Sequence, residues 1–109
     1  LAVLLGAFAA HGLKNRLSDY SLNVFNTATE YHFYHALGLL IVGIIMHLGI
    51  STKPAGISGL LMLIGIILFS GSLYLLALTG IKWLGAITPL GGIAFISGWI
   101  FLAIAFSKI

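Results

Sequence analysis

The chain contains no cysteine, two prolines and only two acidic residues among its 109 positions. The absence of cysteine excludes disulfides, thiolate catalysis, iron–sulfur ligation and covalent haem attachment. The two carboxylates, Asp19 and Glu30, are too few for a di-iron bundle site, which takes about four Glu and two His. Charged residues make up 6% of the chain, against about 25% in soluble domains. A soluble fold of this size could not cover the 61% of residues that are hydrophobic.

Three long segments carry no charge: 31–52 (22 residues), 54–81 (28) and 83–107 (25). Each can cross a bilayer, because about 20 apolar residues at about 1.5 Å each span about 30 Å of hydrocarbon. A fourth apolar run, Leu1 to Ala10, is too short to cross alone. We therefore predict an all-α integral membrane protein, with four transmembrane helices in a single bundle over residues 1–109.

The expected helices follow the apolar runs. Leu22, Phe25 and Ala28 recur at helical spacing beside polar residues, which predicts a short interfacial amphipathic helix between helices 1 and 2. Tyr31 and Tyr34 are then expected in an aromatic belt. A turn at 51–54 separates the second and third spans. The predicted bounds are helix 1 over about 1–11 (the end of a span that starts upstream), an interfacial segment 12–30, helix 2 over 31–50, helix 3 over 57–78 and helix 4 over 86–106.

Four crossings place most polar residues on one face of the membrane, here called side X. Segments 11–30 and 79–85 belong to side X, and the turn at 51–56 and both termini to the opposite side Y. Side X has three cations and side Y two, which leaves the orientation open. We predict a one-sided interfacial ligand-binding site on side X, made of His11, Lys14, Glu30, His35, Ser70, Ser72, Lys82 and Thr88. No charge is expected at mid-bilayer, which argues against an ion pump.

Each of these residues has more than one interpretation. His11 and His35 could hold a haem iron, a quinone or a lipid headgroup, or could simply bond backbone carbonyls at helix ends. Glu30 could pair with Lys14, Arg16 or Lys82, or accept a proton. Ser70 and Ser72 could join helices or line a pocket. Because HExxH and GxSxG motifs are absent, we expect no enzyme activity and no catalytic residue.

Several motifs resemble one known family. They are LGAFAAHGL (5–13), TAxxYxxxHAL (27–37), LFSGSLYLLALTG (68–80), LGxITPxGG (84–92) and Gly98-Trp99. In this order along the chain they resemble the small membrane proteins of domain of unknown function 423, the YgdD/YwdK-like family. The resemblance implies four transmembrane helices in a bacterial cell membrane and no established activity.

The sequence thus predicts a non-enzymatic accessory or scaffold protein, multi-pass in the bacterial inner membrane. Its expected partners are membrane lipids and either further copies of the chain or another membrane protein. Nucleic acid is not expected, since no basic stripe with interleaved aromatics exists. The interpretation as an accessory or scaffold protein predicts no cofactor and no metal. The alternatives are a haem-, quinone- or lipid-headgroup-binding module that uses His11 and His35, and a small-solute channel or exporter.

Overall fold

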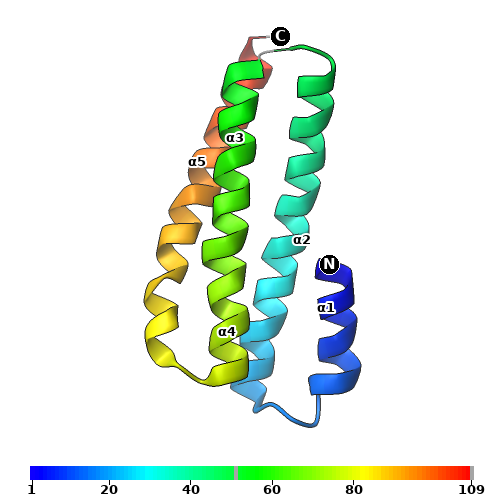
Figure 1. Cartoon of the computed structure of the whole chain (residues 1–109), viewed down its shortest axis with the longest axis vertical. Coiled ribbons are helices and arrows are strands. Elements are labelled where there is room, and N and C mark those ends of the chain that lie inside the picture. The colour runs from blue at the N-terminus through cyan, green and yellow to red at the C-terminus, as the bar shows by residue number, and fades with distance from the viewer. Residues whose placement is uncertain (51, 109) are drawn as a thin grey trace.

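The computed structural model describes residues 1–50 and 52–108, and every element in this part of the chain is helical (Figure 1). The elements form four rods in an elongated bundle with Cα extents of 48 × 26 × 14 Å. The first rod is α1 (Ala2–Phe8) with the π-helical turn η1 (Ala9–Leu13), and the second is α2 (Asp19–His47). The third joins α3 (Thr52–Gly65), the π-helical turn η2 (Ile66–Ser70) and α4 (Gly71–Thr79). The fourth is the 3₁₀ turn η3 (Lys82–Ala86) followed by α5 (Thr88–Ser107).

The second rod is a single helix of 29 residues. Its start is fixed by Ser18, whose hydroxyl accepts a hydrogen bond from the backbone N–H of Ser21 at 3.1 Å. Neither glycine nor proline occurs between this cap and Gly38, so nothing interrupts the helix. The separate interfacial helix predicted within 12–30 is therefore wrong: residues 19–30 are the first three turns of α2. The helix ends before Gly49, which takes the left-handed conformation with φ 72°.

The third rod begins at Thr52, five residues earlier than predicted. Pro54 does not prevent this, because a proline in the first turn removes an N–H that has no helical partner. The turn predicted at 51–54 includes Ser51, which lies outside the described residues. The rod ends at Gly80 with φ 71°, whose N–H bonds the carbonyl of Leu76 at 2.9 Å. The π turn η2 inside the rod was not predicted.

The fourth rod packs closely against the third through small residues. Ser58 donates a 2.6 Å hydrogen bond to the carbonyl of Gly98, where a Cβ would lie 3.0 Å from Met62. Gly91 lies against the backbone of Phe69 in η2. Pro89 occupies the first turn of α5, where its missing N–H has no helical partner. Small residues therefore allow the backbones of these two rods to approach, as in membrane helix pairs.

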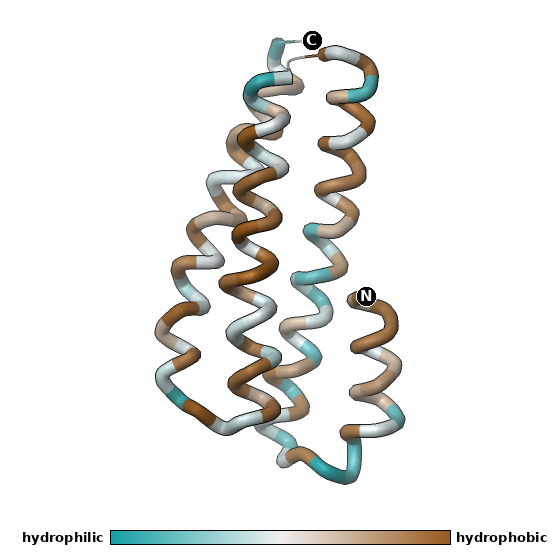
Figure 2. The backbone as a smooth tube through the Cα atoms, viewed as in Figure 1, coloured by the Kyte–Doolittle hydropathy of each residue, from teal (hydrophilic) through white to brown (hydrophobic). Residues whose placement is uncertain are grey.

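Two buried apolar clusters fill the bundle. One, nearer the 48–50 turn, contains Val42, Ile45, Ala55, Met62, Leu102 and Ala105. The other joins the first rod to α2 and α4 through Ala9, Leu13, Phe25 and Ala77. Figure 2 shows that hydrophilic residues continue along the first half of α2, whereas the third and fourth rods are apolar for most of their length.

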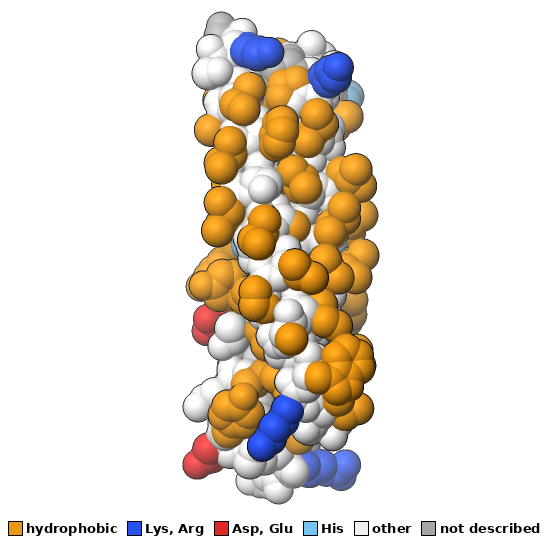
Figure 3. Space-filling model, turned by 90° about the vertical axis from the view of Figure 1, so that its left-hand side faces the viewer, with side chains coloured by type: hydrophobic (Ala, Val, Ile, Leu, Met, Phe, Trp, Pro, Cys, Tyr) orange, Lys and Arg blue, Asp and Glu red, His pale blue; other side chains and the backbone are white. Residues whose placement is uncertain are grey.

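The outside of the bundle is apolar along its flanks, and basic side chains gather at the two ends (Figure 3). Three segments are long and apolar enough to cross a membrane: Asp19–His47, Thr52–Thr79 and Lys82–Ser107. Ala2–Leu13 is apolar but shorter. The all-α prediction is confirmed, and the four predicted rods are present, three of them with the length of a full span.

Candidate functional site

Two of the predicted site residues lie much deeper in the bundle than expected. Because α2 begins at Asp19, Glu30 stands eleven residues and His35 sixteen residues into the helix. At about 1.5 Å per residue these positions are about 16 and 24 Å from the helix start. The predicted start of helix 2 at residue 31 is therefore wrong, whereas the assignment of both residues to a site on side X stays a prediction. Tyr31 and Tyr34 lie in the same part of α2, and their place in an aromatic belt stays a prediction.

The contacts of His35 confirm its depth. Its imidazole stacks on Phe95 of α5 with ring centroids 3.4 Å apart and an interplanar angle of 9°. Phe95 stands thirteen residues from both Lys82 and Lys108, the cations that flank the fourth rod. His35 therefore lies at half the length of the fourth rod, and it is 4% exposed.

Both ring nitrogens of His35 are engaged in hydrogen bonds. Nδ1 lies 2.7 Å from the carbonyl oxygen of Tyr31, and Nε2 lies 2.9 Å from the indole Nε1 of Trp99. A carbonyl only accepts and an indole N–H only donates, so this pattern fits the neutral tautomer with hydrogen on Nδ1. His35 consequently has no nitrogen left for a metal or a haem iron.

A cavity of about 490 Å³ opens beside His35 between α2 and α5; we call it the α2–α5 cavity. Phe69 of η2 also lines it, and the ring of Phe69 is 4.7 Å from Tyr31 and 5.3 Å from Phe95. The cavity is otherwise apolar, with Gly92 and Ile96 on the α5 side. Its aromatic lining consists of Tyr31, Tyr34, His35, Phe69, Phe95 and Trp99.

The π turn η2 positions Phe69, and hydrogen bonds at its end attach it to α5. Ser72 lies 2.9 Å from the carbonyl oxygen of Phe69 and 2.6 Å from the hydroxyl of Thr88. Because the carbonyl can only accept, Ser72 donates to it and Thr88 donates to Ser72. Ser70, fully buried in the same turn, has no hydrogen-bond partner among the residues described. Single π turns inside α-helices are frequent at functional sites.

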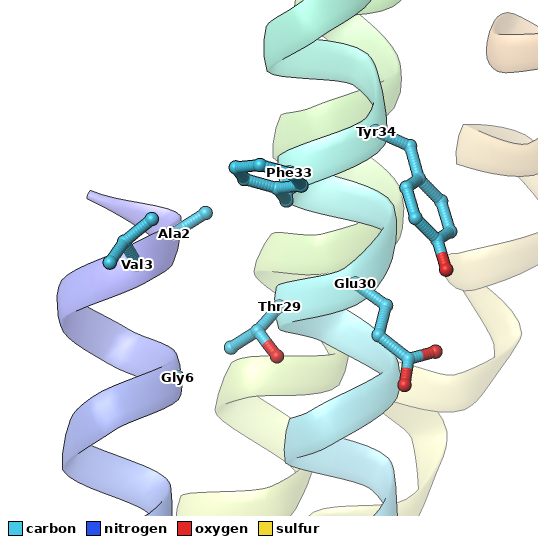
Figure 4. A pocket seen from close by; sticks show the side chains of 7 residues that line it. All are labelled: Ala2, Val3, Gly6, Thr29, Glu30, Phe33 and Tyr34. Carbon is cyan, nitrogen blue, oxygen red and sulfur yellow. The ribbon is translucent and has the colours of Figure 1, made fainter.

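Glu30 lies one helical turn before Tyr34 on α2. Figure 4 shows both side chains extending to the side of α2 away from α1, whereas Thr29 and Phe33 point toward α1. The two residues line a smaller cavity of about 240 Å³, and Tyr34 also lines the α2–α5 cavity. Tyr34 therefore borders both the pocket lined by Glu30 and the aromatic cavity.

The comparisons with known proteins agree on one family. A family model described as "Protein of unknown function (DUF423)" matches residues 5–92. The UPF0382 membrane protein YwdK of Bacillus subtilis is 51% identical over 113 residues, which cover 99% of this chain and 88% of the relative. A UPF0382 membrane protein of Staphylococcus epidermidis is 50% identical over 108 residues, with 99% and 87% covered. The chain belongs to the DUF423 family. No solved structure matches this DUF423 protein.

The eight predicted site residues of this DUF423 protein do not form one cluster. Ser72 and Thr88 are hydrogen-bonded to each other, and they are the only directly bonded pair of the eight within the described part of the chain. His11, Lys14, Glu30 and Lys82 are exposed, and no ion pair joins any of them in residues 1–50 and 52–108. His11 and Lys14 lie where the first rod ends, and Lys82 lies where the fourth begins.

Two alternatives lose support from this geometry. A haem iron held by His11 and His35 would have to displace the hydrogen bond between Trp99 and Nε2 of His35, and no three His, Cys, Asp or Glu side chains group as metal ligands in the described ranges. A channel needs a polar path along the bundle. The six apolar residues buried between α2, α3 and α5 fill that path toward side Y.

Sequence reasoning missed the aromatic partners of His35. Tyr31, Tyr34 and His35 on α2 follow helical spacing, as do Phe95 and Trp99 on α5. This spacing identifies a face on each helix, but pairing the two faces requires the register between α2 and α5. Tyr74, whose hydroxyl lies 2.9 Å from Nδ1 of His32, was missed for the same reason.

Proposed function

We propose that this DUF423 protein is a non-enzymatic accessory protein of the bacterial inner membrane that takes up a small hydrophobic molecule in the α2–α5 cavity. In this role the chain crosses the membrane several times, and the cavity lies near the middle of the bilayer. The observation that carries the proposal is the aromatic-lined space of about 490 Å³ around His35. Ligand pockets typically measure about 300–1,000 Å³ and are mostly apolar.

The flanks of the bundle support a membrane environment for this cavity. Large side chains such as Leu40, Ile93 and Ile96 are about 60% exposed, and the apolar surface that they belong to is far more extensive than soluble monomers usually expose. A ligand dissolved in the bilayer would reach the cavity sideways, between α2 and α5, without crossing water.

The chemistry of the lining supports binding rather than catalysis. His35, the only histidine there, already uses both nitrogens, so a role as general base would first require loss of a hydrogen bond. The hydroxyls of Tyr31 and Tyr34 form no hydrogen bond to any described residue, and they are available to orient a ligand. An accessory role also predicts a protein partner, either a second copy of the chain or another membrane protein.

The test compares two phenylalanine substitutions on α5. Gly92→Phe fills the cavity, because Gly92 lines it. Ile93→Phe adds an aromatic ring at a position that is 61% exposed on the outside of the bundle. We expect menadione, a neutral flat ring, to bind the parent protein and Ile93→Phe in equilibrium dialysis, and to bind Gly92→Phe at least about tenfold less.

Native mass spectrometry from mild detergent gives a second measurement. It reports a small molecule that co-purifies with the parent protein and is lost from Gly92→Phe, together with the number of chains in the assembly. Equal menadione binding by all three proteins, or no binding by any of them, would refute the proposal.

A further inference from the structure

The position of Glu30 in the bundle sets it apart from every other charged residue of the chain. The ring of the next residue, Tyr31, lies 4.7 Å from Phe69 and 6.4 Å from Phe95. Glu30 itself lies about 16 Å from the start of α2, more than a third of the way along this helix. All five cations, Lys14, Arg16, Lys53, Lys82 and Lys108, lie outside or at the ends of the rods. In the membrane arrangement proposed above, a carboxylate this far from the end of a rod is costly and marks a functional site.

The protein itself supplies no counter-charge at this depth. Glu30 is exposed, and it forms neither an ion pair nor a side-chain hydrogen bond with any residue in 1–50 and 52–108. The nearest histidine along the helix, His32, is engaged with Tyr74. The carboxylate of Glu30 can therefore pair with a cation that is not part of the chain.

The α2–α5 cavity, which shares Tyr34 with the pocket lined by Glu30, has the complementary chemistry for a cation. The faces of Tyr, Phe and Trp rings are electron-rich, and cations bind to them most strongly when water is excluded. No Lys or Arg lines the cavity, and the hydrogen bonds of His35 fit its uncharged form. The lining thus attracts positive charge with its rings and contains no group that repels it.

We propose that the α2–α5 cavity binds a hydrophobic organic cation, such as a quaternary ammonium or phosphonium ion with aromatic substituents, and that Glu30 supplies the counter-charge. This inference rests on the proposed function, which requires only a hydrophobic ligand. Tyr34 connects the two parts of the site, because it borders both the cavity and the surface beside Glu30. An anionic ligand is disfavoured by Glu30, and a neutral ring gains nothing from it.

The charge of the ligand is tested with two ions of nearly equal size and hydrophobicity. Tetraphenylphosphonium and tetraphenylborate are each measured against the purified full chain in detergent by equilibrium dialysis, with menadione as the neutral probe. We expect tetraphenylphosphonium to bind at least about tenfold more tightly than tetraphenylborate.

The role of Glu30 is tested with a substitution of each acidic residue. Glu30→Gln keeps the shape of the side chain and is expected to weaken tetraphenylphosphonium binding by about tenfold, while menadione binding stays unchanged. Asp19→Asn removes the only other carboxylate, at the start of α2, and is expected to change neither affinity. Circular dichroism and gel filtration establish that both variants fold.

The outcomes separate the two proposals. The proposed function stands if menadione binds the parent chain but not Gly92→Phe. The cation inference is overturned if the two charged probes bind equally, or if Glu30→Gln does not weaken the binding of tetraphenylphosphonium. If none of the probes binds the parent chain, both are overturned.

Discussion

The indole N–H of Trp99 donates a 2.9 Å hydrogen bond to Nε2 of His35 and so joins α5 to α2 near the middle of the bundle. The donor cannot be replaced by water in a membrane interior, so its loss leaves Nε2 without a partner. We expect Trp99→Phe to lower the free energy of unfolding by about 1–2 kcal/mol, the upper part of the range for polar side-chain bonds between membrane helices. Thermal unfolding in detergent, followed by circular dichroism, measures the change.

Trp83→Phe is the control for this substitution, because Trp83 is 66% exposed in η3 and makes no hydrogen bond to a described side chain. Equal loss of stability in the two variants would mean that the bond between Trp99 and His35 contributes nothing specific.

Two adjacent glycines of α5 are expected to respond in opposite ways to alanine. A Cβ at position 91 would lie 2.7 Å from Cα of Phe69, and closer still to its backbone nitrogen, so Gly91→Ala must push α5 away from η2. Overpacking of this kind costs about 1–3 kcal/mol. At position 92 the nearest atom, Cδ2 of Phe69, is 4.0 Å away, so Gly92→Ala is expected to be neutral or slightly stabilising. Melting temperatures of the two variants, compared in one detergent, provide the measurement; the same temperature for both would contradict the close approach at Gly91.

Two fully buried serines of the third rod provide a second matched pair. Ser58 donates a 2.6 Å bond to the carbonyl of Gly98, and Ser58→Ala should reduce stability by about 0.5–1.5 kcal/mol. The hydroxyl of Ser70 has no partner in the described structure, so its removal by Ser70→Ala should leave stability unchanged or raise it. Denaturant unfolding in mixed micelles measures both. A larger loss for Ser70→Ala than for Ser58→Ala would show that Ser70 is bonded in the membrane.

The arrangement of the chain ends is testable because the protein contains no cysteine, so single cysteines can be labelled without background. We expect Arg16→Cys and Lys82→Cys to react with a membrane-impermeant maleimide from the same side of the membrane. Lys53→Cys should react only from the opposite side, since α3 begins at the other end of the bundle (Figure 1). Labelling of all three positions from one side would contradict the membrane-spanning arrangement.

The apolar runs of the sequence were sufficient to predict the helical rods, but the predicted start of the second helix was wrong. The charge-free run begins after Glu30, so hydropathy alone places the edge of the span at this residue. A helix, in contrast, is limited by its caps and breakers, and the cap at Ser18 stands twelve residues before Glu30. Because of this one difference, Glu30 and His35 lie well inside α2 and not at its start.

The hydrogen-bonded pair of Ser72 and Thr88 shows which part of the candidate site could be predicted from the sequence. Both residues were predicted as site residues from their position on side X, and they do meet. The sequence could not predict that Trp99 would bond His35 across 64 positions, because that contact depends on the register between α2 and α5. It also contained no pattern that distinguishes Ile66–Ser70 from ordinary apolar helix.

The π turn at Ile66–Ser70 makes the number of residues in the third rod as important as their identity. Such a turn holds one residue more than the α-helix around it, so it acts as an insertion that the fold has absorbed. Deleting one residue from 66–70 would therefore restore an uninterrupted α-helix and leave the faces of α3 and α4 aligned. Deleting one residue from the regular α-helix of α3 would instead rotate one side of the rod by about 100° relative to the other, so that the contacts of Ser58 with Gly98 and of Ser72 with Thr88 could not both be kept. We expect a deletion within α3 to lower the melting temperature of the bundle more than a deletion within 66–70.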